Sequence, residues 1–422
     1  MKTSKTARAS KLAFTGLKVG RNYLKYYAKK SIGNKNAKED LEISNAENIY
    51  KTLSELKGGA LKAAQFLSMD KNFVPKIYRD KFKLAQCNAT SLSYPLVVNL
   101  FKNNFDKNPT QIFDTFSKEA IHSASIGQVH KATLDGKTYA VKVQYPGVAK
   151  SISSDMKWVR KIANKALKLK PKDLEKYLDE VERKLKQETD YKRELKMAME
   201  ISEAYKEDKN ISFPKYYKDL STDNILTMSW EEGIPLTEYL ETNPTQDQKN
   251  KIGQTIWDFY KRQLFDLFLI HADPHPGNFL VKKNGDITVI DFGCVKKLPK
   301  KYGIILNELI YGKTINNKAN FSKLLVDLKL IKNNDSPEEI EYFTPLFSEI
   351  ITLLTKPFQK SKFDFGDKNF MGKFKEIITR ESSDKKILKL NPARGTKHLI
   401  FINRIIIGLF TIMDELNAKI EN

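Results

Sequence analysis

Two short segments joined by a predicted hairpin constrain the fold of this 422-residue chain more than any other feature. Residues 271–278 are HADPHPGN and residues 289–293 are VIDFG. Asp273 and Asn278 are five positions apart (278 − 273), and Asp291 opens a D-F-G triplet, which matches the spacing of a phosphoryl-transfer centre. One Asp positions the nucleophile there, while the Asn and the second Asp are oxygen ligands that suit magnesium. The pattern predicts ATP and Mg²⁺ as cofactors, with Asp273 catalytic and Asn278 and Asp291 on the metal.

The residues between the two segments support this interpretation. Residues 279–281 and 287–290 are rich in β-forming side chains and flank Asn284-Gly285, a pair that favours a tight hairpin turn. Such a hairpin would hold Asn278 and Asp291 at neighbouring strand ends. A D-F-G triplet alone often marks only a turn, so the interpretation depends on its combination with the upstream segment.

A phosphate-binding lysine is expected on a strand upstream of this centre. Residues 138–144, TYAVKVQ, have the required form and contain Lys142. The alternative is an exposed strand lysine, because the chain has 73 Lys and Arg. Ahead of it, residues 123–130 (SASIGQVH) should cover the phosphates, with Ser125, Gly127 and Gln128 near the nucleotide. Only Gly127 remains of the three glycines of an ordinary kinase loop, which argues against an ordinary protein kinase.

In this order, the motifs SASIGQVH, AVKVQ-x-PG, HADPHPGN and DFG resemble those of the UbiB/AarF family of atypical kinase-like proteins. The resemblance runs from about residue 50 to at least residue 300. It implies an α+β, two-lobed protein-kinase-like fold with a family-specific N-terminal helical extension. The family K-x-G-Q motif corresponds to residues 62–65, KAAQ, with Ala64 in place of the glycine. The resemblance implies a family-specific gate formed by Lys62, Gln65, Glu188 and Asp190.

The resemblance also implies that Glu194 pairs with Lys142. Residues from about 174 to 205 form a charged stretch that predicts one long helix, in which most carboxylates would pair with nearby cations. Glu188 and Glu194 are six positions apart, about 600° around a helix, so one can face Lys142 while the other faces the Lys62 segment. By residue chemistry alone, residues 61–67 form an amphipathic surface helix.

Four regions are predicted along the chain. They are a basic amphipathic N-terminal helix region at 1–45, a family-specific helical insertion at 46–110, a kinase-like N-lobe at 111–233 and a helical C-lobe at 234–422. Residues 224–230 should form the strand that enters the hinge between the lobes. Trp230 and Glu231 would then lie beside the adenine.

Composition limits the class of protein. Two cysteines do not suggest a disulfide framework or a zinc site. The most apolar stretch, residues 399–413, is broken by Asn403 and Arg404, which leaves nine uninterrupted residues against the roughly 20 of a membrane span. We therefore expect a buried helix there. The first residues lack the apolar core of a secretory signal, so the expected location is cytoplasmic.

A net charge of +22 implies an anionic partner. A nucleic acid is not expected, because no zinc finger, aromatic RNA-binding signature or compact recognition helix is present. The first 40 residues carry 11 Lys or Arg and two acidic residues, interleaved with Leu12, Leu17, Leu24 and Tyr27. Such a helix can lie on an anionic membrane, which would place the protein peripherally at an inner membrane surface. Alternatively, its apolar side docks on the protein core and its lysines face solvent.

The leading hypothesis is a magnesium-ATP-binding atypical kinase-like enzyme, either an ATPase or a small-molecule or lipid kinase. Its link to quinone or isoprenoid lipid metabolism rests on the resemblance alone. A nucleotide-dependent lipid-binding scaffold without productive phosphoryl transfer is the alternative, although a scaffold needs no complete catalytic set. A Ser/Thr protein kinase is ranked last, because no A-P-E follows the D-F-G to close an activation segment. The sequence does not identify the phosphoryl acceptor or the oligomeric state.

Overall fold

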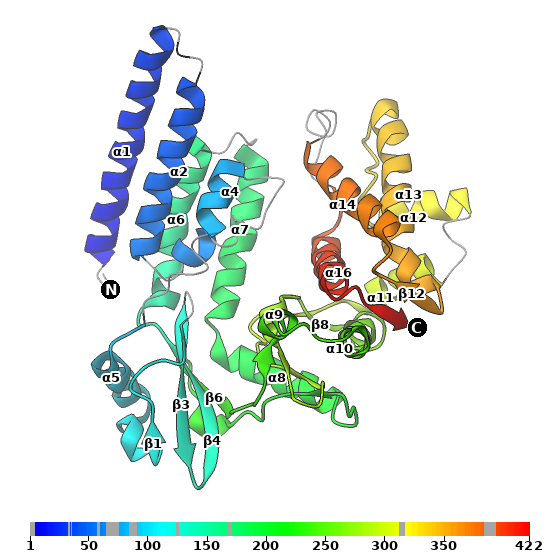
Figure 1. Cartoon of the computed structure of the whole chain (residues 1–422). Coiled ribbons are helices and arrows are strands. Elements are labelled where there is room, and N and C mark those ends of the chain that lie inside the picture. The colour runs from blue at the N-terminus through cyan, green and yellow to red at the C-terminus, as the bar shows by residue number, and fades with distance from the viewer. Residues whose placement is uncertain are drawn as a thin grey trace. The chain divides into compact units, whose positions relative to one another are not determined.

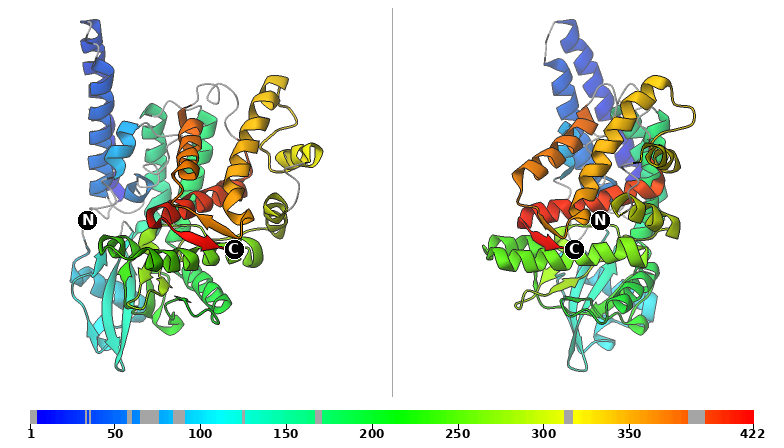
Figure 2. Two further views of the ribbon diagram at one scale, coloured as in Figure 1. Left: turned by 45° about the vertical axis from the view of Figure 1, so that its right-hand side comes forward. Right: turned by 90° about the vertical axis from the view of Figure 1, so that its right-hand side faces the viewer.

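The computed structural model describes residues 5–32, 34, 36–56, 60–64, 76–83, 91–123, 126–166, 171–311, 317–383 and 394–422. Gln65 and Ser125, both predicted site residues, lie outside these ranges. The chain forms two compact units, whose elements are drawn in Figures 1 and 2. The first comprises Met1–Lys196 and Lys215–Trp230, and the second comprises Met197–Pro214 and Glu231–Asn422.

One part of the first unit is helical. Its described helices are α1 (Lys5–Ser31), α2 (Ala37–Leu56), α4 (Lys76–Lys83), α6 (Val148–Ala166) and α7 (Pro171–Glu188). Ile49, Met156 and Leu178 belong to one buried apolar cluster that joins α2, α6 and α7. Arg160 of α6 adds ion pairs to three carboxylates of α7. The predicted N-terminal helical extension is therefore confirmed, although the boundary predicted at residue 45 falls inside α2.

The other part of the first unit is an antiparallel sheet. Its strands are β1 (Thr115–Phe116), β2 (His122–Ser123), β3 (Gly127–Leu134), β4 (Lys137–Gln144) and β6 (Ile225–Ser229). The order is β1-β3-β4-β6, with β2 also paired to β3. Asp135 and Gly136 both adopt positive φ, at 49° and 70°, which is the tight turn expected of an Asp-Gly pair. Helix α5 (Tyr94–Phe105) contributes Phe101 to the apolar core of the sheet.

The described residues of the second unit form three small sheets. The four-stranded one has the order β5-β10-β9-β7, and β11 pairs with β8 and β12 with β13. The strands are β5 (Ile211–Ser212), β7 (Ile234–Pro235), β8 (Leu269–His271), β9 (Phe279–Val281), β10 (Ile287–Val289), β11 (Val295–Lys297), β12 (Lys362–Asp364) and β13 (Lys419–Glu421). The predicted β9–β10 hairpin is confirmed, with Ile287 opposite Val281. Its turn is wider than the predicted two-residue type, because only Gly285 has positive φ and its N–H donates to the Lys282 carbonyl.

Helices surround these sheets in the second unit. They are α9 (Leu236–Glu241), α10 (Gln246–Arg262), α11 (Lys300–Ile310), α12 (Lys318–Asp327), α13 (Pro337–Gln359), α14 (Lys368–Ser383) and α16 (Lys397–Leu416). Fully buried Trp257 of α10 lies against Phe358 of α13, at 4.4 Å between ring centroids, and stacks with Phe410 of α16. The buried helix predicted at 399–413 is confirmed as part of α16. Among the described helices, none is both long and apolar enough to cross a membrane.

The single helix predicted from residue 174 to 205 is wrong. The chain leaves the helix at Thr189 and Asp190, which separates α7 from α8 (Tyr191–Ala204). Oδ1 of Asp190 accepts the backbone N–H of Arg193 at 3.0 Å, as the cap of a new helix does. The charge pattern did not reveal this break, because Asp190 is only one of many carboxylates in the stretch. The predicted α+β fold class is confirmed.

Candidate functional site

Lys142 is held by a buried carboxylate in the first unit. It lies on β4, and its Nζ donates to both carboxylate oxygens of Glu194, at 2.8 and 3.1 Å. Glu194 lies in the first turn of α8 and its side chain is 1% exposed, whereas that of Lys142 is 18% exposed. The lysine therefore has a fixed position and keeps some access to solvent, which a phosphate-binding cation requires.

Tyr191 supports the same lysine from a second side. Its buried ring lies 5.2 Å from Nζ of Lys142, within the range of a cation–π contact. A Cβ built on Gly127 would lie 2.8 Å from the Tyr191 hydroxyl and 2.7 Å from the Val143 carbonyl. Gly127 is thus required for close packing. This is a different reason from the backbone freedom of a phosphate loop. No signal in the sequence singled out Tyr191 except its place directly after Asp190.

Three of the four predicted gate residues, Lys62, Glu188 and Asp190, are described, and they lie in the first unit. Lys62 belongs to the helical stretch 60–64 and pairs with Glu188, the last residue of α7, at 3.1 Å. The two side chains are 27% and 15% exposed. Asp190 is exposed and caps α8 through Arg193. The resemblance implied the pair of Glu194 with Lys142, and helix geometry allowed Glu188 to face the Lys62 segment instead. The intervening break means that the two glutamates belong to different helices.

Gln128 has contacts that favour a structural role for its side chain. The residue is 1% exposed. Its Oε1 accepts the Leu92 N–H at 2.6 Å, and its Nε2 lies 2.8 Å from Nε2 of His130. Nδ1 of His130 lies 2.8 Å from the carbonyl oxygen of Ser117, so it carries the hydrogen and leaves Nε2 to accept from Gln128. Contact with a nucleotide remains a prediction for this residue, and its amide is already used.

The chain passes from the first unit to the second between Trp230 and Glu231. The Trp230 N–H donates to the Thr138 carbonyl at 3.0 Å, which continues the pairing of β6 with β4, and Lys131 lies over its ring at 4.6 Å. In the second unit, Glu231 lies 3.8 Å from Nζ of Lys282. Both residues are half-buried, and their role beside adenine stays a prediction.

In the second unit, His271 joins the two predicted motifs. Its Nε2 lies 2.6 Å from the Asp291 carbonyl, which can only accept, so Nε2 carries the hydrogen. Nδ1 then accepts from the Tyr260 hydroxyl at 3.1 Å. Burial lowers the pKa of His271 from its usual 6.5, which keeps the ring neutral. His275 also braces this loop, because its Nδ1 accepts the Gly277 N–H.

Asp273 lies in the loop after β8, and two side chains bond to it. Nδ2 of Asn278 donates to its main-chain oxygen at 3.0 Å and lies 3.3 Å from Oδ2. Arg404 of α16 donates from Nη2 to Oδ1 at 2.8 Å. Each of the two carboxylate oxygens therefore has a neighbouring donor that orients it. The two side chains of the Asp273–Arg404 pair are 37% and 25% exposed, so the carboxylate remains accessible.

Arg404 was missed as a site residue, because the sequence gives no motif that links it to Asp273. It entered the sequence argument only as a break in an apolar run. The available signal was physical: a guanidinium within an otherwise apolar helix needs a charged or polar partner. Close packing supports the contact, since a Cβ built on Gly408 would lie 2.2 Å from Cγ of Pro274. Helix α16 thus lies directly against the loop that carries Asp273.

Asn278 and Asp291 offer oxygen atoms of the kind that magnesium prefers. Asn278 uses its amide nitrogen on Asp273, so its carbonyl oxygen is the atom suited to a cation. Oδ1 of Asp291 accepts the Gly293 N–H at 2.9 Å, which fixes the carboxylate. Among the described residues, no group of three or more His, Cys, Asp or Glu side chains could hold a metal by itself. The donor set therefore fits an ion that also takes phosphate oxygens and water as ligands.

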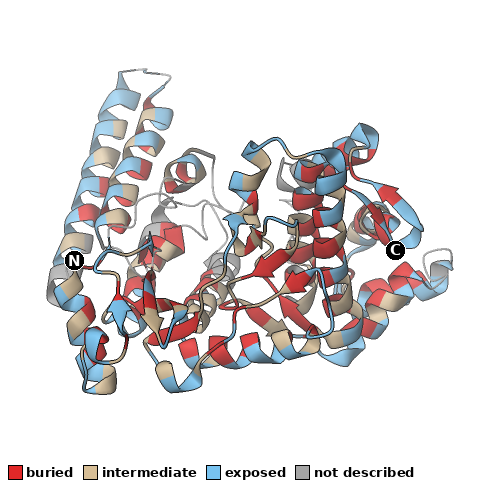
Figure 3. Cartoon of the chain, turned by 60° about the horizontal axis from the view of Figure 1, so that its bottom comes forward, coloured by how far each residue is buried: buried red, intermediate tan, exposed pale blue. Residues whose placement is uncertain are grey.

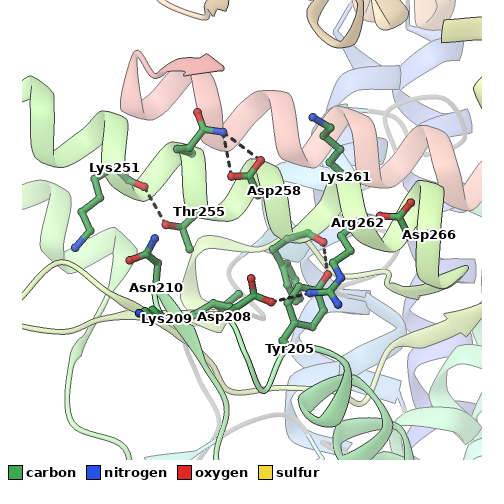
Figure 4. A pocket seen from close by; sticks show the side chains of 13 residues that line it. Tyr205, Asp208, Lys209, Asn210, Lys251, Thr255, Asp258, Lys261, Arg262 and Asp266 are labelled. Carbon is green, nitrogen blue, oxygen red and sulfur yellow. Dashed lines mark hydrogen bonds and ion pairs between the residues drawn. The ribbon is translucent and has the colours of Figure 1, made fainter. Parts of the chain in front are cut away.

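A hollow of about 420 Å³ lies elsewhere in the second unit, between α10 and residues 205–211 (Figure 4). Three of its charged groups have partners in the lining, as Arg262 pairs with Asp208 at 2.7 Å and Gln254 donates to both oxygens of Asp258. Burial raises the pKa of the Asp258 carboxyl. None of the predicted site residues that the structure describes lines this hollow.

Comparison with known proteins gives consistent matches. The family model for the ABC1 atypical kinase-like domain matches residues 84–325. The chain is 28% identical over 387 residues to "Atypical kinase COQ8B, mitochondrial" of Danio rerio, which covers 88% of this chain and 61% of that protein. It is 27% identical over 390 residues to "Atypical kinase COQ8, mitochondrial" of Schizosaccharomyces pombe, covering 90% and 62%. The chain thus spans about three fifths of the length of these two curated relatives.

A solved structure also resembles the chain. It is the complex of Rv3197 with erythromycin from Mycobacterium tuberculosis, with a TM-score of 0.62 and 25% sequence identity. The match covers 92% of this chain and 95% of that chain. The predicted kinase-like fold is confirmed by these comparisons.

Proposed function

Because the chain belongs to the ABC1 atypical kinase-like family, the UbiB/AarF group that its motifs resemble, we propose that it binds magnesium-ATP and transfers the γ-phosphoryl group. The acceptor would be water or a small molecule or lipid. The observation that carries the proposal is the fixed orientation of Asp273, whose carboxylate is bonded by Arg404 and Asn278. Such preorganisation serves a reacting group, because positioning supplies much of the catalysis in phosphoryl transfer.

Lys142 and Glu194 are proposed to act on the phosphates of ATP. The ammonium group of Lys142 would contact phosphate oxygens, and Glu194 would keep it in place through the pair at 2.8 Å. The partial exposure of Lys142, at 18%, leaves room for a second anionic ligand. Replacement of either residue should weaken nucleotide binding.

Asp273 is proposed to accept the proton of the attacking hydroxyl group or water. As the new O–P bond forms, the bond between the γ-phosphorus and the ADP oxygen breaks, and ADP leaves with that electron pair. Arg404 is a positioning residue, because its contact is with Asp273. Bound Mg²⁺ would neutralise charge on the phosphates, and Asn278 and Asp291 are the residues that would hold it.

The pathway served is proposed to be quinone or other isoprenoid lipid metabolism, with a lipid of this class or a precursor of one as a binding partner. This part rests on the family resemblance. The Lys62–Glu188 pair, at 3.1 Å, would act as the family-specific gate, with Asp190 and Gln65 near it in sequence. A pair with both side chains partly exposed can open at small cost, which suits a gate better than a fully buried pair would.

The test is magnesium-dependent release of phosphate from ATP by the purified protein. We expect turnover that EDTA removes and that Asp291→Asn reduces at least about 100-fold, since the metal ligand acts on developing charge. The matched control is Asp327→Asn, which makes the same change at an exposed position of α12. Turnover that survives in Asp291→Asn would overturn the proposed metal role.

The variant Asp273→Asn distinguishes an enzyme from the scaffold alternative. An enzyme should lose turnover in this variant and still gain thermal stability from magnesium-ATP, because ligand binding to the folded state raises its stability by mass action. A scaffold would instead complement a deletion strain as well as the natural chain does. Radiolabel transferred to added protein, but not to lipid extracts, would favour the Ser/Thr kinase alternative.

A further inference from the structure

The junction between α10 and β8 departs twice from regular backbone. Residues Gln263–Leu267 form a π-helical turn directly after α10, and Phe268 then adopts φ 52° and ψ 22°, in the left-handed region. Single π-helical turns are rare and occur frequently at functional sites. Positive φ is an outlier for a bulky residue, so it persists only where the surrounding structure imposes it. Strand β8 begins at the next residue and ends at His271, two positions before Asp273.

Two contacts impose the conformation of Phe268. Its carbonyl accepts the Leu298 N–H at 2.7 Å. A Cβ built on Gly303 of α11 would lie 1.8 Å from Cε1 of the Phe268 ring, so a residue larger than glycine there would displace the ring. All three residues of β8 are buried, and Figure 3 shows most of the short strands of the second unit buried as well. The path of the chain from α10 to Asp273 is therefore fixed.

Gln263, the first residue of the π-helical turn, bonds to the main chain at the end of this path. Its side chain is fully buried, and its Oε1 accepts the His271 N–H at 2.6 Å. Tyr260, three positions before Gln263, bonds to Nδ1 of the same histidine at 3.1 Å. Gln263 thus fixes the main chain of His271, and Tyr260 fixes its ring.

The His271 N–H needs this acceptor because β11 cannot supply one. In an antiparallel ladder, consecutive residues alternate between bonded and non-bonded pairs. Ala272, the next residue, donates its N–H to the Cys294 carbonyl at 2.7 Å, so the His271 N–H points to the other side of the strand. Gln263 takes the place of a neighbouring strand there. Without it, a buried N–H would be left without an acceptor, which favours displacement of the main chain.

Displacement of His271 would move Asp291, the proposed metal ligand of the D-F-G triplet. Nε2 of His271 donates to the Asp291 carbonyl at 2.6 Å. Oδ1 of Asp291 accepts the Gly293 N–H at 2.9 Å, so the direction of its carboxylate depends on the main chain around it. Groups that orient a metal ligand contribute strongly to metal affinity.

We propose that Gln263 is a positioning residue of the metal site, which acts through His271 on the main chain of Asp291. The inference rests on the proposed function, because it takes Asp291 as a ligand of Mg²⁺. Gln263 acts by its bond to His271 and not on a reacting group. If Gln263 served only to stabilise the core, its replacement would lower stability and leave the affinity for the metal unchanged.

The test is the affinity of the full chain for Mn²⁺ in the presence of ADP, measured by the EPR signal of free Mn²⁺. Mn²⁺ suits this test because it prefers the same oxygen ligands as Mg²⁺. Gln263→Leu keeps a side chain of similar size without an acceptor. Its dissociation constant for Mn²⁺ should rise at least about fivefold, less than the roughly 10- to 100-fold typical of direct partners of a metal ligand. The Mg²⁺ concentration for half-maximal phosphate release should rise by a similar factor.

Gln263→Glu is the conservative variant. A buried carboxyl group stays protonated, so its carbonyl oxygen can still accept the His271 N–H. Its dissociation constant for Mn²⁺ should stay within about twofold of that of the natural chain, because the acceptor is retained. If Gln263→Leu does not fold, Gln263→Asn replaces it, since the shorter side chain cannot reach the His271 N–H.

Gln254→Leu is the matched control. Gln254 also lies on α10, and its Oε1 accepts a main-chain N–H, that of Glu421, at 2.7 Å. The same change therefore removes the same kind of bond from β13, which carries none of the proposed site residues. Mn²⁺ affinity and phosphate release should match those of the natural chain. Unfolding in urea would verify that both variants are folded and compare their stabilities.

The outcomes separate failure of this inference from failure of the proposed function. Unchanged Mn²⁺ affinity in folded Gln263→Leu, together with weaker binding by Asp291→Asn, would overturn the role of Gln263 and leave the metal site in place. Equal losses in Gln263→Leu and Gln254→Leu would also overturn it, because any lost bond of α10 would then act on the site. Normal Mn²⁺ binding by Asp291→Asn would overturn the metal role of Asp291, and the role of Gln263 with it. A natural chain whose Mn²⁺ affinity depends on Gln263 but which releases no phosphate would overturn phosphoryl transfer alone.

Discussion

Lys142 in the first unit and Asp273 in the second are both held by an ion pair. The two pairs differ in the burial of the partner and in its distance along the chain. Glu194, the partner of Lys142, is 1% exposed and lies on α8, 52 residues along the chain. Arg404, the partner of Asp273, is 25% exposed and lies 131 residues along the chain. The first pair is therefore part of the core of its unit, and the second is a surface-accessible contact.

Because of this difference, the first pair is expected to stabilise the fold and the second to position a side chain. A charge left alone in a buried site is costly, because the protein cannot hydrate it. A partly exposed pair contributes little to stability, since water can replace either partner. Disruption of the Lys142 pair should therefore destabilise the fold, whereas disruption of the Asp273 pair should change the reaction and leave the fold intact.

The largest expected effect is that of Lys142→Met, which leaves Glu194 buried without its cation. We expect a loss of about 3 kcal/mol in the free energy of unfolding, measured with urea, because breaking a buried pair is strongly destabilising. Lys62→Met is the matched control. It breaks a more exposed pair with Glu188, so it should cost about 1 kcal/mol or less.

A double variant sharpens this prediction. Lys142→Met/Glu194→Leu removes both charges and should recover most of the lost stability while nucleotide binding stays weak. Equal losses for Lys142→Met and Lys62→Met would contradict the distinction between the two pairs.

Arg404→Gln should have a smaller effect on stability and a clear effect on turnover. The free energy of unfolding should change by less than about 1 kcal/mol, because the pair is partly exposed. The kcat should fall roughly 10- to 100-fold with the KM for ATP nearly unchanged, since Asp273 loses its orientation. Arg404→Lys should retain part of the activity, because it keeps the charge but not the planar donor pair.

The control for Arg404 is another ion pair of α16, made with Lys375 of α14. Lys375→Gln breaks the pair between Lys375 and Asp414 of α16, with side chains 63% and 26% exposed. Neither kcat nor stability should change appreciably. A loss of activity in this variant would mean that any disturbance of α16 affects turnover, and Arg404 would have no special role.

The smallest expected effect is the pH dependence set by buried histidines. Burial lowers the pKa of His271 and of His130 below 6.5 in the folded state. The unfolded chain therefore binds more protons as pH falls below about 6.5, and stability falls with it. The Tm should decrease from pH 7.5 to pH 5.5, and His271→Gln should reduce that slope.

His122→Gln provides the comparison for this titration. His122 is exposed on β2, so its replacement should leave the dependence of Tm on pH unchanged. If His271→Gln leaves the dependence of Tm on pH unchanged, His271 does not cause the loss of stability at low pH.

Local patterns in the sequence predicted the elements around both pairs. The alternation of residues 138–144 and the hairpin from 279 to 290 need few long-range contacts, so strands β4, β9 and β10 were predicted at nearly their observed bounds. The apolar run at 399–413 predicted a buried helix for the same reason. The family resemblance also implied which glutamate meets Lys142.

Contacts between residues far apart in the sequence could not be predicted from such local patterns. The pairing of Arg404 with Asp273 depends on where α16 packs, and no spacing encodes it. Gln128 was assigned to the nucleotide, yet Gln128 and His130 alternate on one face of β3 and bond to each other. That period of two within an apolar strand was a usable signal for a buried polar pair. The break at Asp190 was hidden among neighbouring charges.

The contact between Arg404 and Asp273 also has a consequence during synthesis. At about 5–20 residues per second, the ribosome adds the arginine roughly 6–26 s after the aspartate, because 131 residues separate them. Until α16 has emerged and packed through Gly408 against Pro274, the carboxylate has no guanidinium to orient it. The nascent chain therefore carries Asp273 in an incomplete setting, and the proposed reaction requires this late helix to be in place.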